Sequence, residues 1–417
     1  MKLKQLIFVV VLIVAIFKSQ TISATIQPGD TLLPDLASLA PNQKVNYLLN
    51  VLETTRNLSA QKAIEYAEEG LVWAVELESN SDKARILNFI GNNYYNLGNY
   101  DQALNYYQKA LHMVLRIGKK TEMANIMQKI GIIYFNLNDY RKALLYFEQT
   151  LKVFQELQFP NREAEVYTSI GLIYLHWEEF EKAIENYELA YSIYTSLDHL
   201  PSIANVCYLK GYVLCKLKNY DESEKWFNSG LKINKTIHSN NEVAKIYDAL
   251  GQLNSDKKDF SRALEYYKKA YKIHEQMNDK IILSQSLNNM GNAYKELGNF
   301  IEASKSFEQS LKLAIDLDLK LTQMDNYKSF YELYYFKNDS KKALIYYQKF
   351  VALRDSIFNK NSNVESGKYN IDEELLIAKK QLIKKNKLFL YTVVVSIVII
   401  IILIIMLLLQ RTKIKNS

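Results

Sequence analysis

Residues 90–111 read IGNNYYNLGNYDQALNYYQKAL, and the same pattern returns every 40 residues along most of the chain. A glycine marks the returns at Gly91, Gly131, Gly171, Gly211, Gly251 and Gly291. An aromatic column keeps the same step at Tyr107, Phe147, Tyr187, Phe227, Tyr267, Phe307 and Tyr347. A column of small residues does so at Ala103, Ala143, Ala183, Ser223, Ala263, Ala303 and Ala343. Such regularity indicates a chain built from internal repeats.

Each repeat is expected to fold as two helices joined by a tight turn. Apolar residues recur at steps of three and four, which is the spacing of one face of a helix. In the second repeat the helices are predicted at residues 122–137 and 139–157. The break between them holds Gly98, Asn138, Gly298 or Asn338 in different repeats, and these residues tolerate the left-handed conformation that ends a helix. The position after the break is Asn or Asp in most repeats, and both are strong N-caps.

The hairpins are expected to stack on one another, because a single hairpin cannot bury its apolar face alone. The glycine and small-residue columns let two helices approach closely, and the aromatic columns are predicted to fill the space between neighbouring hairpins. The whole chain holds only 13 Gly and 5 Pro, the residues that most often interrupt helices. This scarcity is typical of a long helical array. The sequence therefore predicts an all-α fold.

These columns resemble the tetratricopeptide repeat family, whose pattern is a small residue, then Tyr, then Tyr/Phe-x-x-Ala-x-x-x-Tyr/Phe-x-x-Ala. The resemblance covers residues 81–360 as seven units. They lack the usual Trp of the first helix and the terminal Pro of the second, and they are longer than the family's ~34 residues. This form is similar to the units of kinesin light chains and of bacterial peptide-sensing regulators. The resemblance implies a right-handed α-solenoid of stacked helical hairpins. Residues 25–80 would precede it as an N-terminal segment with a degenerate capping hairpin.

Both ends of the chain are apolar. Residues 1–24 resemble a signal peptide, with Lys2 and Lys4 before a short apolar run; the alternative is an uncleaved signal anchor. Residues 388–409 hold no charge, and a helix of that length would reach ~33 Å, enough to cross a bilayer. The expected fold class is thus an all-α solenoid plus one C-terminal transmembrane helix.

The expected location follows from these two segments. The lysines before residues 388–409 favour a cytoplasmic location for the segment that precedes the span. The signal at residues 1–24 favours export of that segment instead. We give the signal more weight, because long domains cross the membrane largely regardless of charge. We therefore expect a single-pass membrane protein with its repeats on the periplasmic side and a short basic tail, residues 410–417, in the cytoplasm. Residues 361–387 would form a linker and a juxtamembrane helix. Its apolar seam would permit a homodimer; the alternative is a solvated helix that runs into the span.

Charge and motifs exclude several function classes. The net charge is +7, of which residues 1–24 carry +3 and residues 359–417 carry +6. The residues between these two ends therefore carry −2. A segment with that charge lacks the positive surface that binds the phosphates of a nucleic acid. The sequence shows no Gly-rich phosphate loop, HExxH or GxSxG, and its five histidines lack metal-ligand spacing. We expect no catalysis, no cofactor and no bound metal.

The family geometry places the first helix of each hairpin on a concave face, which would form a peptide-binding groove. The candidate residues in the first three units are Asn88, Asn92, Tyr95, Asn125, Gln128, Ile132, Phe135, Asn136, Leu172 and Leu175. Asn and Gln donate and accept hydrogen bonds together, so they can hold an extended peptide backbone, and the apolar residues would take its side chains. The alternative is that these residues only solvate or pack the groove.

Two functions remain open at this point. The first is a membrane-anchored receptor or adaptor that binds a protein or peptide for a signalling partner. Its layout resembles the sensor half of bacterial membrane-bound tetratricopeptide histidine kinases and helix-turn-helix regulators, without the output domain that follows the span in that group. The second is a structural scaffold of an envelope protein assembly.

Overall fold

A computed structural model describes residues 39–54 and 59–358, which form sixteen helices and no strand. The chain divides into two compact units, residues 1–217 and 218–417. The helices of the first unit are α2 (Pro41–Thr54), α3 (Ala60–Glu76), α4 (Asn80–Asn96), α5 (Tyr100–Ile117), α6 (Lys120–Asn136), α7 (Tyr140–Glu156), α8 (Pro160–His176), α9 (Phe180–Ser196) and α10 (Leu200–Lys216). Those of the second are α11 (Tyr220–Thr236), α12 (Asn240–Asp256), α13 (Phe260–Met277), α14 (Lys280–Glu296), α15 (Phe300–Asp316), α16 (Lys320–Phe336) and α17 (Ser340–Phe358).

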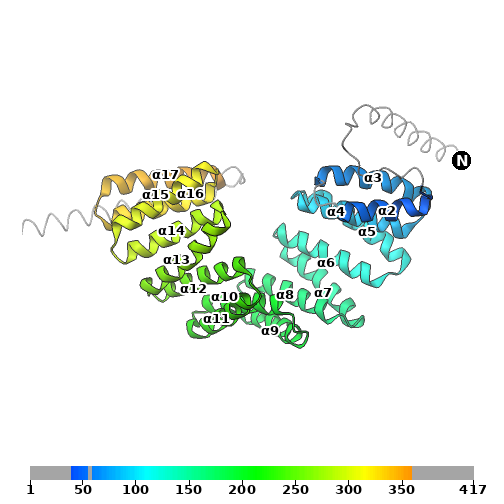
Figure 1. The fold of residues 1–417 in the computed structure, drawn as a ribbon, viewed down its shortest axis with the longest axis horizontal. Helices are drawn as coiled ribbons and strands as arrows, with labels where there is room; N and C mark the ends of the chain where they lie inside the picture. Colours follow the sequence, from blue (N-terminus) through cyan, green and yellow to red (C-terminus); the bar gives the residue numbers. More distant parts are fainter. Residues whose placement is uncertain (1–38, 55–58, 359–417) are drawn as a thin grey trace, which may run out of the picture. The chain divides into compact units, whose positions relative to one another are not determined.

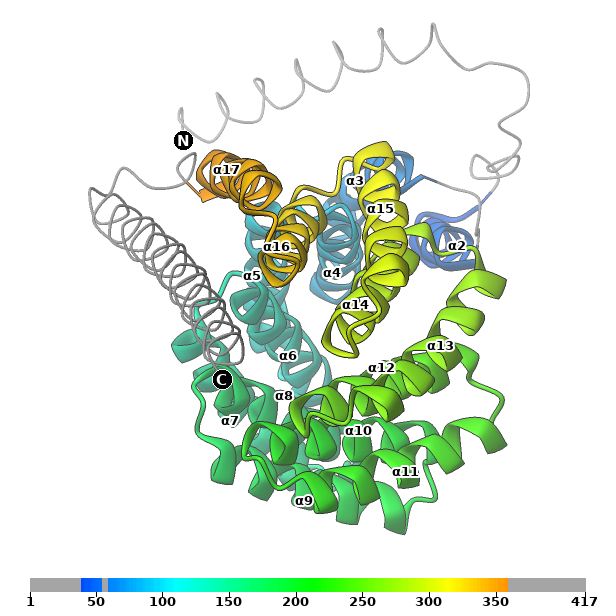
Figure 2. The same ribbon diagram turned by 90° about the vertical axis from the view of Figure 1, so that its left-hand side faces the viewer.

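Within each unit, every helix packs on the helix before it and the helix after it. Figure 1 shows this succession from α3 to α9 in the first unit, and Figure 2 shows the hairpin of α14 and α15 in the second. Short turns join the helices, and such turns bring consecutive helices together as antiparallel hairpins. The all-α solenoid of stacked hairpins predicted from the repeat is confirmed for the described residues.

Each of the helices α3 to α16 is followed by one residue in the left-handed conformation. The predicted positions Gly98, Asn138 and Asn338 have φ of 72°, 60° and 58°. Behind Gly98, the Asn99 backbone N–H donates to the Tyr94 carbonyl at 2.9 Å, which satisfies a carbonyl of the last helical turn. The predicted N-caps that accept a hydrogen bond from a backbone N–H of the next helix are Asn99, Asp139, Asp259, Asn299 and Asp339. Glu179 and Asn219 stand at the same position and form no such cap.

The repeated glycines make room for an aromatic ring of the second helix of the same hairpin. A Cβ atom added at Gly171 would lie 2.5 Å from Tyr187 Cε1, and one at Gly131 would lie 2.6 Å from Phe147 Cε1. The rings of Tyr187 and Phe147 are fully buried. The close approach predicted for the glycine column is therefore confirmed. The rings also join cores with the next hairpin, as Phe147 does with Val166 and Ile170 on α8, so the predicted filling between hairpins accompanies the contact with the glycine.

Other aromatic and aliphatic residues pack neighbouring helices together. Tyr94 on α4 stacks on Tyr106 on α5 with ring centroids 5.4 Å apart. Buried Ile126 and Ile130 on α6 join the same core as Tyr107 on α5. Apolar burial of this kind stabilises a fold by ~25 cal/mol per Å², so the continuity of this core across helices holds the first unit together.

One part of the expected fold class is corrected. Across residues 39–54 and 59–358, no helix is long and apolar enough to cross a membrane. Even the apolar helix α10 has 17 residues and contains Lys210 and Lys216, whereas a span needs ~20 apolar residues. The span predicted at residues 388–409 lies outside the described residues. The supported fold class is thus the all-α solenoid alone, and the single-pass membrane location derived from that span is withdrawn.

Several other predicted segments also lie outside the described residues. They are the signal peptide at 1–24, the linker and juxtamembrane helix at 361–387 with its dimer seam, and the tail at 410–417. The predicted capping hairpin at residues 25–80 coincides in part with α2 and α3, where Ala63 is buried in a cluster with Leu48 and Ile64.

Candidate functional site

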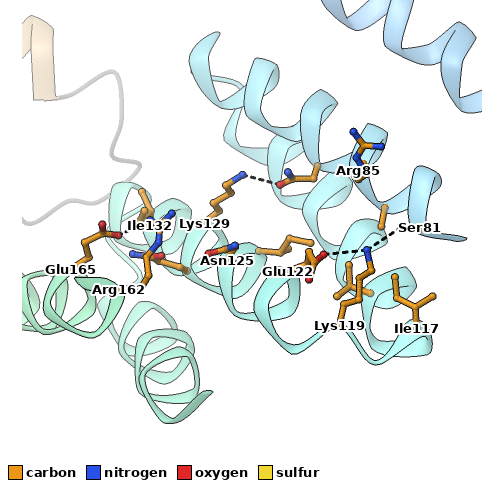
Figure 3. Close-up of a pocket in the computed structure, with 15 residues that line it drawn as sticks. Ser81, Arg85, Ile117, Lys119, Glu122, Asn125, Lys129, Ile132, Arg162 and Glu165 are labelled. Atoms are coloured by element: carbon orange, nitrogen blue, oxygen red, sulfur yellow. Dashed lines mark hydrogen bonds and ion pairs between the residues drawn. The ribbon is translucent and has the colours of Figure 1, made fainter. Parts of the chain in front are cut away.

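The first unit holds a pocket of about 410 Å³ that is lined by α4, α5, α6 and α8. Figure 3 shows its side chains converging from these helices, with Lys129 and Asn125 on α6 near the centre. The aliphatic part of the lining includes Ala84, Ile126 and Ile132. The rest of the lining is polar or charged, so the pocket offers hydrogen bonds beside an apolar surface of similar extent.

Four of the ten predicted groove residues line this pocket. They are Asn88, Asn125, Gln128 and Ile132. The other six are not part of its lining, and they are Asn92, Tyr95, Phe135, Asn136, Leu172 and Leu175. All ten side chains are half-buried. The structure therefore gathers the residues from the N-terminal half of α4 and from α6, and leaves those further along the helices outside the pocket.

Several of the predicted residues connect neighbouring hairpins. The Asn136 Nδ2 group on α6 donates to the Tyr95 hydroxyl on α4 at 3.1 Å. The Phe135 ring on α6 meets the His176 ring on α8 edge to face, with centroids 5.2 Å apart. Asn92 accepts a hydrogen bond of 2.8 Å from the Tyr107 hydroxyl of its own hairpin and one of 2.9 Å from Lys129 Nζ on α6 of the next. These residues thus help to hold the repeats together, in addition to any role toward a ligand.

Asn125 and Gln128 differ from these residues. Within residues 39–54 and 59–358, neither side chain has a hydrogen-bond partner in the protein. Each amide can donate and accept at once. The pocket therefore presents two unused amides three residues apart on α6, beside the partly exposed Ile132.

Lys129 lines the pocket and is not among the residues predicted from the sequence. Its Nζ donates to the Oδ1 atoms of Asn88 and Asn92, at 2.9 Å each, and lies 5.6 Å from the centre of the Tyr107 ring. Burial, reinforced by the nearby Arg162 guanidinium, lowers the pKa of the Lys129 ammonium to about 8. A sequence signal existed, because Lys129 is the single charged residue between positions 123 and 137.

The remaining charges around the pocket occur as pairs. Lys119 contacts Glu122 at 3.2 Å, and Arg162 contacts Glu165 at 2.8 Å. Arg85 contacts Asp82 at 3.4 Å. These pairs are largely exposed, so each contributes little to stability.

Two inward-facing polar residues of the second unit are engaged within the protein. Lys295 on α14 is almost fully buried and forms ion pairs with Glu296 and with Glu332 of α16. Asn292 donates to the Ser329 hydroxyl at 3.4 Å. Asn288 stands four repeats after Gln128, and its Oδ1 has no hydrogen-bond partner among the described residues. The two units therefore do not differ uniformly in how their inward polar groups are used.

Comparison with known families and structures places these helices among well-described repeats. Sequence profiles of the tetratricopeptide repeat match residues 82–156, 122–196 and 202–276, and a second profile of the same repeat matches residues 284–314. Together these matches cover more than half of the chain. No curated protein sequence matches this chain significantly.

Solved structures with the same fold are distant in sequence. Aspartyl phosphate phosphatase F from Bacillus subtilis is 16% identical with a TM-score of 0.57, covering 81% of this chain and 86% of that one. The apo form of RapI is 17% identical with a TM-score of 0.54, covering 67% and 99%. A Rap protein complexed with Competence and Sporulation Factor is 15% identical with a TM-score of 0.51, covering 78% and 96%. At these identities the likeness extends to the fold alone.

Proposed function

Because this chain belongs to the tetratricopeptide repeat family, we propose that its first unit binds a peptide or an unstructured protein segment along α4, α6 and α8. In this role the protein acts as a receptor or adaptor for a signalling partner. The proposal is one of binding without catalysis, since the ionisable side chains of the pocket are engaged with one another or with amides.

The observation that carries the proposal is the pair of unpartnered amides, Asn125 and Gln128, in a pocket of about 410 Å³. Ligand pockets in proteins are typically ~300–1,000 Å³. An extended peptide backbone presents one N–H and one C=O group per residue, and a side-chain amide satisfies both kinds of group. Two such amides on one helix face are therefore suited to hold a peptide main chain.

Apolar side chains continue the same face beyond the pocket. Phe135 on α6 and Leu172 and Leu175 on α8 are half-buried, so each retains apolar surface toward solvent. Partly exposed aromatic and aliphatic side chains of this kind act as anchors in protein interfaces. The ligand we propose thus combines a main chain held at Asn125 and Gln128 with at least one apolar side chain.

The signalling role is supported by fold neighbours. A Rap protein of this fold was solved in complex with Competence and Sporulation Factor, so an array of this kind holds a factor in that protein. The similarity is in fold, so the ligand class and the signalling partner of this chain are part of the proposal.

The test uses peptides selected from a random display library on the full-length protein. Replacing Asn125 and Gln128 together by Ala should weaken the selected peptides by more than tenfold, or ~1.4 kcal/mol. The matched control replaces Asn105 and Gln108, the same residue types at the same spacing on α5, where both are exposed. Equal weakening by the two pairs, or failure to select any peptide, would contradict the proposal.

A further inference from the structure

The interface between α15 and α16 differs from the matching interface in the first unit. Between α5 and α6 the interface is apolar, with Ala110 of α5 in one core with Ile126 and Ile130 of α6. On α15, Ser310 stands at the repeat position of Ala110. On α16, Asn326 stands at that of Ile126, and both polar side chains are fully buried. The hairpin of α16 and α17 is therefore attached to the hairpin before it through buried polar groups as well as through apolar residues.

Hydrogen bonds connect these two residues to α14. Asn326 Nδ2 donates to Ser310 Oγ and to the Thr322 carbonyl, at 2.8 Å each. Ser310 Oγ donates to the Ser284 carbonyl of α14 at 2.6 Å, and Ser284 Oγ donates to the Ser310 carbonyl at 2.9 Å. The Asn326 Oδ1 atom is buried and has no hydrogen-bond partner among the described residues. A buried network that leaves one acceptor unsatisfied holds two helices together less well than an apolar core.

Other polar contacts also join α16 to the hairpin before it. Lys295 of α14 is buried and pairs with Glu332 of α16 at 2.5 Å. Gln323 Nε2 of α16 donates to the Ala314 carbonyl of α15 at 2.9 Å. Because α16 lies against both α15 and α14 (Figure 2), these contacts are lost together when α16 moves away. Water then satisfies each of the separated groups, so the contacts contribute little net stability to the interface.

The contacts inside the hairpin of α16 and α17 are of another kind. The Phe330 ring of α16 stacks on the Tyr346 ring of α17 with centroids 4.6 Å apart, and Tyr334 stacks on the same ring at 5.5 Å. Across the α15–α16 interface, Phe307 meets Phe330 edge to face at 5.5 Å. Separation of α16 from α15 thus loses this ring contact and leaves the stacked rings of the hairpin in place.

We propose that the α15–α16 interface is a hinge, at which the hairpin of α16 and α17 opens as one unit while α14 and α15 remain folded. Opening gives Asn326 Oδ1 the water partner that it lacks in the closed state. It also exposes apolar surface of Phe307 and Leu333, which share one buried cluster, and this cost keeps the closed state the more populated one. The last described hairpin, and the chain that follows Phe358, can therefore change position without unfolding of the repeats before it. This inference is independent of peptide binding.

The test is hydrogen exchange of the full-length protein under native conditions, read by mass spectrometry. In the wild-type protein the amides of α16 and α17 should exchange through one shared opening, about tenfold or more faster than those of α14 and α15. The variant Ser310→Ala/Asn326→Val introduces the residue types that stand at these positions in Ala190 and Val166. It replaces the network by apolar contacts, so exchange of α16 and α17 should become about fivefold slower or more. Exchange of α14 and α15 should change by less than about twofold.

The matched control is Thr150→Val on α7. Thr150 stands at the repeat position of Ser310 and is fully buried, but its hydroxyl donates to the Tyr146 carbonyl of its own helix at 2.7 Å. Loss of this hydroxyl should change the exchange of α8 and α9 by less than about twofold, because the hydroxyl bonds within α7. Slowing of α8 and α9 as large as that of α16 and α17 in the double variant would overturn the proposal.

Three results for the hairpin itself would also overturn it. Unchanged or faster exchange of α16 and α17 in the double variant would mean that the polar network holds the interface closed. Exchange that spreads along α17 from its end ahead of α16 would be fraying of a terminal helix. Joint exchange of α14 and α15 with α16 and α17 would place the opening at another interface. If the double variant does not fold, Asn326→Leu replaces it, since Leu has nearly the shape of Asn, and the same slowing is expected.

Discussion

Replacing Gly171 by Ala tests the contact that recurs in the repeats. The added Cβ would lie 2.5 Å from Tyr187 Cε1 and 2.8 Å from Cδ1, whereas carbon atoms in contact stay ~3.5 Å apart. The buried ring must therefore move by about 1 Å. Overpacking of a core costs ~1–3 kcal/mol, and the better helix propensity of Ala returns up to ~1 kcal/mol. We expect a net loss of about 1–2 kcal/mol in the hairpin of α8 and α9.

Local hydrogen exchange is the suitable measurement, because stability in a stacked array is a property of each repeat and its neighbours. Amides of residues 160–196 should exchange about tenfold faster in Gly171→Ala. The matched control is Gly70→Ala, where the nearest atom is the flexible end of Leu48 at 2.4 Å and not a rigid ring. Its effect should be less than half as large. Unchanged exchange in α8 and α9, or equal effects of the two variants, would refute the ring contact as the reason for the glycine column.

Three other outcomes follow from named contacts. The pKa of Lys129 is about 8 in the folded protein and ~10.4 in the unfolded chain, so between these pH values the unfolded chain binds more protons. The urea concentration at half-unfolding should therefore increase as the pH is raised from about 8 to about 10. This increase should vanish in Lys129→Met. Asn92→Ala should cost ~1–3 kcal/mol in urea unfolding, because it leaves the buried Tyr107 hydroxyl without its acceptor, whereas Asn125→Ala should change stability by less than ~0.5 kcal/mol. Glu178→Gly should raise stability by about 0.5–1 kcal/mol in the same assay, because φ at this position is 59°.

The fold was predictable because its decisive contacts repeat at one spacing. The glycine and aromatic columns sit sixteen residues apart. The structure brings the two members of a pair into contact within one hairpin at Gly91, Gly131, Gly171, Gly251 and Gly291. The predicted helices at 122–137 and 139–157 correspond to α6 and α7, with ends that differ by at most two residues. Such differences arise because the αL residue and the N-cap belong to the turn, whereas the apolar pattern runs on through them. Asn219 did not cap its helix, since its amide donates to Glu222 instead.

The candidate site was only partly predictable. The family geometry found Asn125 and Gln128, but it assumes that only side chains at the centre of the concave face reach the groove. Lys129 and Arg162 stand at flanking positions, and their long side chains extend into the pocket. The family geometry also does not reveal that Asn92 and Tyr95 form hydrogen bonds with groups on neighbouring helices, because those partners come from other parts of the repeat. Contacts between side chains across repeats are set by packing and leave no periodic signal.

The most direct test of the central claim is site-specific photo-crosslinking of a selected peptide to the full-length protein. A photoreactive amino acid placed at Ile132, in the pocket wall, should crosslink to the peptide, and excess unlabelled peptide should suppress the product. The same group placed at Ile301 on α15, which is 79% exposed, serves as the comparison and should give little product. Efficient crosslinking at 132 and not at 301 is the result that peptide binding along α4, α6 and α8 predicts. Crosslinking at 301 alone, or equally at both positions, would contradict it.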